Sequence, residues 1–128
     1  MRFFIVFPTL IAPLLSATLV PMPREIDLGE GKLVVDVQTA VIAPGDLAPQ
    51  AEVLTAALQK TTGYVHRFRT VKQVARFRYK RAIKLSLGKF EKPEFYRIEI
   101  TPEGATIQGS DLAGLMHGIQ TMAQLLLS

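Results

Sequence analysis

The sequence contains no cysteine and no tryptophan. Without thiols the chain can form no disulfide framework, no thiolate zinc site and no cysteine nucleophile. The absence of cysteine does not decide the compartment, because a domain of this size can be stable on its hydrophobic core alone.

The sequence also lacks the length for more than one domain, since it has 128 residues. Compact domains typically run about 100–150 residues, and a (β/α)₈ barrel needs about 250. We therefore expect a single domain and no barrel within these residues.

Motifs typical of catalytic or metal sites are missing as well. The two histidines, His66 and His117, have no carboxylate or second histidine at ligand spacing, and no His-Glu-x-x-His motif occurs. Ser86 and Ser110 have no glycine elbow around them. The carboxylates lie beside basic residues or turns, which indicates solvated surface charge. The sequence thus predicts no catalytic residue, no metal ligand and no cofactor.

The N-terminus has the parts of a secretory signal peptide. Met1-Arg2 is a short basic start, residues 3–15 are apolar but shorter than the ~20 residues that span a bilayer, and Ser16-Ala17 are small. We expect cleavage near Ala17, a mature domain of residues 18–128, no transmembrane span after cleavage, and a secreted, periplasmic or envelope location. An uncleaved anchor is the main alternative, and a buried first strand is a weaker one.

Hydrophobic patterns along the mature part predict strands and two helices. Residues 21–27 are expected to be an extended surface segment, followed by a turn at Gly29-Glu30-Gly31. Runs rich in β-branched or alternating apolar residues predict strands over 32–37, 39–43, 64–69, 82–87, 96–100 and 105–108, of which the first two can also form one bent strand. The last two form a hairpin around Thr101-Pro102-Glu103-Gly104.

The first helix is predicted to begin at Pro49, to run to about Thr61 and to end at Gly63. The second begins after a cap at Ser110 or Asp111 and runs to residue 127. The apolar residues expected on the inner faces are Ala51, Leu54, Ala57 and Leu58 in the first helix, and Leu112, Leu115, Met116, Ile119, Met122, Ala123 and Leu126 in the second. These elements predict an α+β fold, a single mixed or antiparallel sheet with two helices packed on one face.

A basic segment interrupts this pattern, because no acidic residue occurs between Glu52 and Glu91. Its cations, interleaved with aromatic residues, are candidates for binding a polyanion: Arg67, Arg69, Lys72, Arg76, Arg78, Lys80, Arg81 and Lys84. Such a basic face can bind an anionic polysaccharide, nucleic acid or an acidic membrane surface, and export would favour an anionic glycan over nucleic acid. The alternative is a solvated arm or loop without a specific partner.

Four stretches of the chain resemble a known family. Residues 96–127 read YRIEITPEGATIQGSDLAGLMHGIQTMAQLL, and a P-x-P segment in residues 20–26, the Gly29-Glu30-Gly31 turn and Thr62-Gly63-Tyr64 precede them. In this order they resemble the N-terminal domain of bacterial-type beta-N-acetylhexosaminidases, glycoside hydrolase family 20. Met116-His117 departs from the family, where two aromatic residues are common.

The resemblance implies a zincin-like accessory domain that packs against a catalytic (β/α)₈ barrel. In that family the substrate's own N-acetyl group attacks the anomeric carbon, assisted by an adjacent Asp-Glu pair in the barrel. No adjacent Asp-Glu pair occurs in this sequence. The resemblance therefore implies a structural, non-catalytic domain whose activity requires a separate chain or a continuation of the gene. A secreted module for anionic glycan and a decayed fragment are the alternatives.

Overall fold

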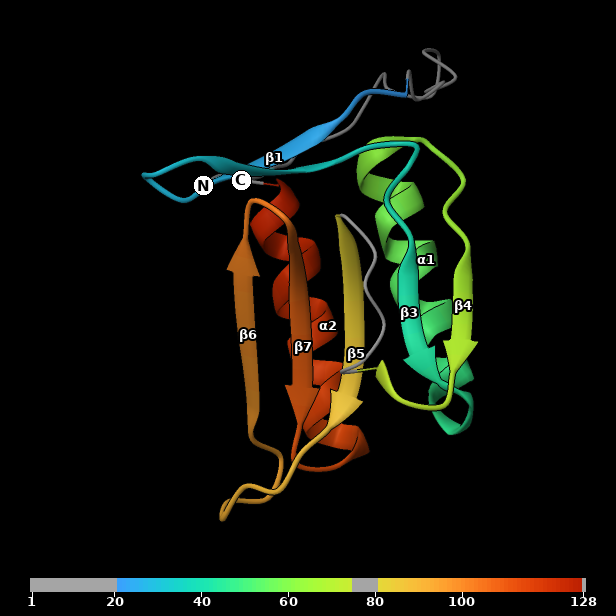
Figure 1. Ribbon diagram of the computed structural model, residues 1–128, viewed down its shortest axis with the longest axis vertical. Coiled ribbons are helices and arrows are strands. Elements are labelled where there is room, and N and C mark those ends of the chain that lie inside the picture. Colours follow the sequence, from blue (N-terminus) through green and yellow to red (C-terminus); the bar gives the residue numbers. More distant parts are fainter. Residues whose placement is uncertain (1–20, 75–80, 128) are drawn as a thin grey trace, which may run out of the picture.

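The computed structural model of the protein describes residues 21–74 and 81–127. Its main body is a five-stranded sheet with two helices on one face (Figure 1). The strands lie in the order β4-β3-β5-β7-β6, and all neighbouring pairs are parallel except the antiparallel pair β6 and β7. The bounds are β3 Val41–Pro44, β4 Phe68–Val71, β5 Ala82–Leu87, β6 Tyr96–Thr101, β7 Gly104–Gly109, α1 Ala48–Thr62 and α2 Leu112–Leu127. The predicted α+β class, with both helices on one sheet face, is confirmed.

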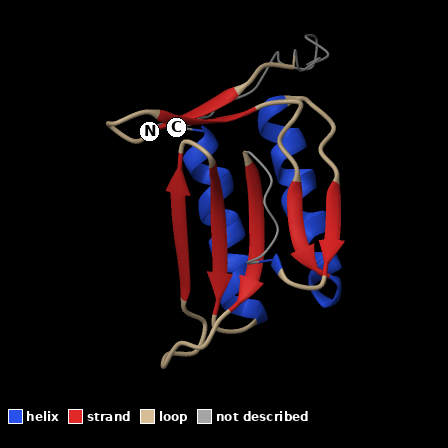
Figure 2. Ribbon diagram, in the orientation of Figure 1, coloured by secondary structure: helices blue, strands red, loops and turns tan. Residues whose placement is uncertain are grey.

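A second, two-stranded sheet crosses one end of the main body (Figure 2). It pairs β1 (Arg24–Asp27) antiparallel with β2 (Lys32–Val35), and Ile26 lies opposite Leu33. The prediction of an extended surface segment over residues 21–27 was incomplete, because β1 within it pairs with β2. The predicted turn is present, and Gly29 and Gly31 both adopt positive φ angles there.

The alternative of one bent strand over residues 32–43 is wrong, because β2 and β3 belong to different sheets. Short polar side chains break the extended backbone between them. The Asp36 N–H donates to Thr39 Oγ1 at 3.0 Å, and the Gln38 N–H donates to Asp36 Oδ1 at 2.9 Å. These bonds replace ladder hydrogen bonds and form a turn.

Helix α1 follows a short 3₁₀ turn at Gly45–Leu47 and has Pro49 in its first turn, as predicted. Gly63 ends it in the left-handed conformation, with its N–H bonded to the Gln59 carbonyl at 2.8 Å. The strand predicted over 64–69 is wrong at its start, since β4 begins only at Phe68. Residues 64–67 are held by side-chain contacts instead, as described below.

The C-terminal hairpin and helix α2 form as predicted, with Tyr96 opposite Gly109 in the hairpin. Asp111 caps α2, since its Oδ1 accepts the Gly114 N–H at 2.8 Å. This bond and a second from the Glu94 N–H lower the pKa of the Asp111 carboxyl. The inner face differs from the prediction in two ways. Gly114 and Gly118 are buried on it, and Leu112 is exposed.

The main core lies between the helices and the sheet. It is built from aliphatic side chains of both layers, with Leu33 and Val35 of β2 closing one end. A smaller cluster of Ile42, Val74 and Ala82 lies on the other side of the sheet, which we call the open face. Within the described residues, no helix combines the length and hydrophobicity needed to cross a bilayer.

Candidate functional site

The structure describes five of the predicted polyanion-binding residues, Arg67, Arg69, Lys72, Arg81 and Lys84. Lys72 follows β4 and lines a small pocket with Pro44, Gly45 and Asp46. Arg67 and Arg81 lie before β4 and β5, while Arg69 and Lys84 lie within those strands. The predicted residues Arg76, Arg78 and Lys80 lie outside the described residues, and so does the predicted signal peptide.

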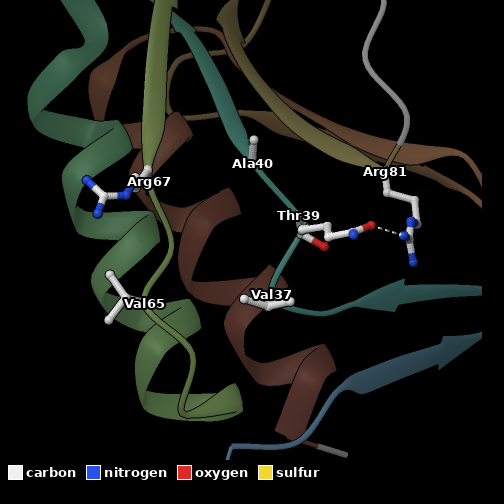
Figure 3. Close-up of a pocket in the computed structure, with 7 residues that line it drawn as sticks. Val37, Thr39, Ala40, Val65, Arg67 and Arg81 are labelled. Carbon is white, nitrogen blue, oxygen red and sulfur yellow. Dashed lines mark hydrogen bonds between the residues drawn. The ribbon is translucent and has the colours of Figure 1, made fainter.

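Arg67 and Arg81 line a pocket of about 760 Å³ at the end of the sheet where the parallel strands begin. We call it the arginine pocket, and it is shown in Figure 3. Its lining residues are Val37, Gln38, Thr39, Ala40, Val65, Arg67 and Arg81. Arg81 is already engaged, because its guanidinium bonds Asp36 Oδ2 at 2.8 Å and Gln38 Oε1 at 2.9 Å. An anionic ligand in this pocket would have to compete with Asp36 for Arg81.

His66 lies between two of these lining residues and is 7% exposed. Its Nδ1 is 3.2 Å from the Thr39 carbonyl oxygen, which can only accept, so Nδ1 carries the proton. Its Nε2 is 2.9 Å from Thr62 Oγ1, and the Thr62 hydroxyl donates to the Leu58 carbonyl at 2.8 Å. Thr62 Oγ1 in turn accepts the Tyr64 N–H at 3.1 Å. His66 thus ties the end of α1 to the turn before β3, which is a structural role.

Arg69 and Lys84 lie on the open face. Arg69 of β4 and Lys84 of β5 both pair with Ile42 of the central strand β3. The two cations therefore flank Ile42 on the same sheet face. This pair is the part of the predicted basic segment that the described residues do bring onto one surface.

A second pocket, of about 750 Å³, lies on the open face at the carboxyl ends of β3, β5 and β7. We call it the strand-end pocket. It is lined by Pro44, Asp46, Leu47, Gln73, Val74, Lys84, Ser86, Leu87, Thr106 and Gln108. Of its lining residues, only Lys84 was predicted from the sequence to bind a ligand. The alternation in residues 82–87 and 104–108 was a signal for it, because it places Lys84, Ser86, Thr106 and Gln108 on the sheet face away from the helices.

No three histidine, aspartate or glutamate side chains come together as a metal site anywhere in residues 21–74 and 81–127. His117 is exposed and lies 3.5 Å from Glu94 Oε1 at the surface. Neither histidine therefore belongs to a metal-ligand cluster in the described part of the chain.

Comparison with known proteins extends these observations. Residues 16–128 match the model of glycosyl hydrolase family 20, domain 2. The GH20 beta-N-acetylhexosaminidase from Streptomyces coelicolor A3(2) is similar in structure, with a TM-score of 0.52 and 26% identity over 83% of this chain and 19% of that one. A GH138 enzyme targeting pectin rhamnogalacturonan II shares the fold, with a TM-score of 0.52 and 22% identity over 69% of this chain and 13% of that one. The chain thus spans less than a fifth of either enzyme. No curated protein matches the chain.

Proposed function

Because the chain belongs to the glycosyl hydrolase family 20, domain 2 family, we propose that it is the accessory domain of a beta-N-acetylhexosaminidase and is not catalytic by itself. Such an enzyme hydrolyses terminal N-acetylhexosamine residues on a separate barrel domain. The sequence contributes no adjacent Asp-Glu pair for that chemistry. Its role would be to support the barrel by packing against it.

The observation that carries this proposal is the outer surface of α2. The helix contains no Asp, Glu, Lys or Arg in its 16 residues. Apart from leucines, its exposed residues are Ala113, His117, Gln120 and Gln124. Leu112 and Leu127 are 49% and 63% exposed beside them. A solvent-facing helix normally carries charges on that side, so this surface fits contact with another protein layer.

Helix α1 differs on the same layer, because Glu52 and Lys60 are exposed on it. Its only large exposed hydrophobic residue among those described is Val53. We therefore expect α2, rather than α1, to form the centre of the contact with the barrel.

The test is association of the chain with a family 20 barrel produced without its own N-terminal domain, such as that of the Streptomyces coelicolor enzyme. We expect a complex by size-exclusion chromatography with light scattering. The double variant Leu112→Glu and Leu127→Lys should abolish it. These charges suit the helix dipole, since the acid enters the first turn and the base the last, so the variant should remain folded.

The matched control is Val37→Glu with Val65→Lys, which also replaces two exposed apolar residues but lies at the arginine pocket. It should leave the complex intact. Equal loss in both variants, or an intact complex with charged α2, would contradict docking through α2. Turnover of a chromogenic N-acetylglucosaminide by the purified chain alone would contradict the non-catalytic role.

We propose a second function for the basic segment, the binding of an anionic glycan outside the cell after export by residues 1–17. The observation that favours it is the placement of Arg69 and Lys84 on one open sheet face. Arg81 contributes less, because Asp36 neutralises it.

A further inference from the structure

The strand-end pocket lies where open sheets of parallel strands commonly bind ligands. The next two strands along the chain, β4 and β5, lie on opposite sides of β3 in the sheet. The strand order therefore reverses at β3. The connection from β3 passes through α1 on the helix face, whereas Val74, which follows β4, lies on the open face. In such sheets ligands bind outside the carboxyl ends of the strands at the reversal. The pocket occupies this position and is independent of the α2 surface.

Two residue pairs of the parallel strands β5 and β7 supply the polar wall of the strand-end pocket. Lys84 pairs with Thr106, and Ser86 pairs with Gln108, so four polar side chains form a compact group on the open face. All four are half-buried. Within residues 21–74 and 81–127, the side chains of Lys84, Ser86 and Thr106 make no hydrogen bond or ion pair, which leaves their donors and acceptors available to a ligand.

Gln108 is held in place from the neighbouring strand. Arg97 Nη2 donates to Gln108 Oε1 at 3.1 Å, and the Arg97 guanidinium lies 5.4 Å from the centre of the Phe90 ring. With Oε1 engaged, Nε2 of Gln108 remains as a donor. The pocket thus contains a fixed amide donor beside a lysine and two hydroxyl groups.

The charges and size of the pocket select the class of ligand. Asp46 and Lys84 line the pocket with one charge of each sign, so these two charges offset each other; Arg69, which the anionic-glycan proposal pairs with Lys84, does not line it. Hydroxyl and amide groups both donate and accept, which suits a ligand with many hydroxyl groups. Pro44, Leu47 and Val74 add apolar lining to the pocket. A volume of about 750 Å³ lies in the range of small-molecule sites. We propose that the strand-end pocket binds a neutral sugar unit through Lys84, Ser86, Thr106 and Gln108.

The test is a ¹⁵N NMR titration of the chain with cellotriose, maltotriose and chitotriose in turn. At least one sugar should shift the amide signals of Lys84, Ser86, Thr106 and Gln108 and the side-chain amide of Gln108. Lys84→Met and Gln108→Leu should each weaken binding about fivefold or more, as expected for one lost hydrogen bond. Spectral dispersion reports whether each variant folds. Gln38→Leu and Arg67→Met, in the arginine pocket, are the matched controls and should leave the affinity unchanged.

Three results would overturn the proposal. The first is the absence of shifts with all three sugars up to about 10 mM, a concentration that reveals even millimolar complexes. The second is an unchanged affinity in folded Lys84→Met and Gln108→Leu. The third is shifts with inorganic phosphate and none with the sugars, which would mean an anion site. None of these results bears on docking through α2, so the two proposals fail separately.

Discussion

Gly118 of α2 lies directly against Ile107 of β7, so that a β-carbon on Gly118 would come within 2.6 Å of Ile107 Cγ2. The same β-carbon would lie 3.3 Å from the Tyr96 ring. Gly114, one turn earlier, leaves no space for a side chain beside the Phe95 carbonyl oxygen. These glycines set how closely the helix approaches β6 and β7.

Gly118→Ala should therefore destabilise the domain, although alanine favours helix by about 1 kcal/mol. Overpacking a core contact costs about 1–3 kcal/mol, so we expect a net loss of about 1 kcal/mol in the free energy of unfolding, measured in urea. Gly45→Ala is the matched control, because a β-carbon at Gly45 would have no atom within 4 Å, and its change should stay within about 0.5 kcal/mol. A more stable Gly118→Ala would contradict close packing here.

Thr62→Val should destabilise the link between α1 and the turn before β3. The valine keeps the shape but removes the hydroxyl that bonds His66 Nε2 and accepts the Tyr64 N–H. Leaving buried polar groups unpaired costs about 1–3 kcal/mol, which thermal or urea unfolding would measure. Thr70→Val, at an exposed position of β4, serves as the control. If both variants lose the same stability, the His66 contact contributes nothing.

The elements that the sequence predicted well are those whose residues repeat with a regular period. Alternation identified β5 and the β6–β7 hairpin, and spacing by three and four identified α2. The small sheet was missed because Ile26 is the only apolar residue of β1, so its pairing depends on β2 rather than on its own pattern. The strand at 64–69 was misplaced because residues 64–69 alternate in the way that a strand does. The ring of buried His66 instead bonds Thr62 and Thr39, which keeps residues 64–67 in a loop.

The pockets could not be predicted because strand order is a long-range property. Periodicity places Lys84 and Thr106 on strand faces, but it does not show that β5 and β7 are parallel neighbours. The predicted cations were likewise close in sequence, yet Arg81 turns toward Asp36 while Lys84 lies on the open face. Sequence spacing did not show this difference between the two residues.

The Asp111 carboxylate should make stability depend on pH in the acid range. Its folded pKa lies below the ordinary value of 3.8, because the Gly114 and Glu94 N–H groups bond the ionised form. The carboxylate therefore stabilises the fold above that ordinary value, and this contribution is lost as the pH falls through the lowered pKa. Asp111→Asn can still cap α2 but does not titrate, so its urea midpoint should fall less between about pH 6 and about pH 3 than that of the wild type. Parallel curves would contradict the assignment.

Export would be shown by the N-terminus of the protein made by cells carrying the intact gene. If residues 1–17 are a signal peptide, mass spectrometry of the extracellular or periplasmic fraction should find a mature chain beginning at Thr18. Arg2→Glu, which reverses the basic start, should reduce export, whereas Lys32→Glu in the mature domain should not. A membrane-bound chain that retains Met1 would instead support the uncleaved anchor.

Binding of anionic glycan can be separated from general attraction by net charge. The chain has a formal net charge of +4, so some retention on a heparin-type resin is expected from charge alone. Arg76, Arg78 and Lys80 are the centre of the predicted basic segment, and replacing all three by serine should lower the salt concentration needed for elution. Replacing Lys32, Lys60 and Lys92 by serine removes the same charge elsewhere and should lower it less. Equal effects would mean that heparin senses only the total charge, and the basic segment would then have no specific role.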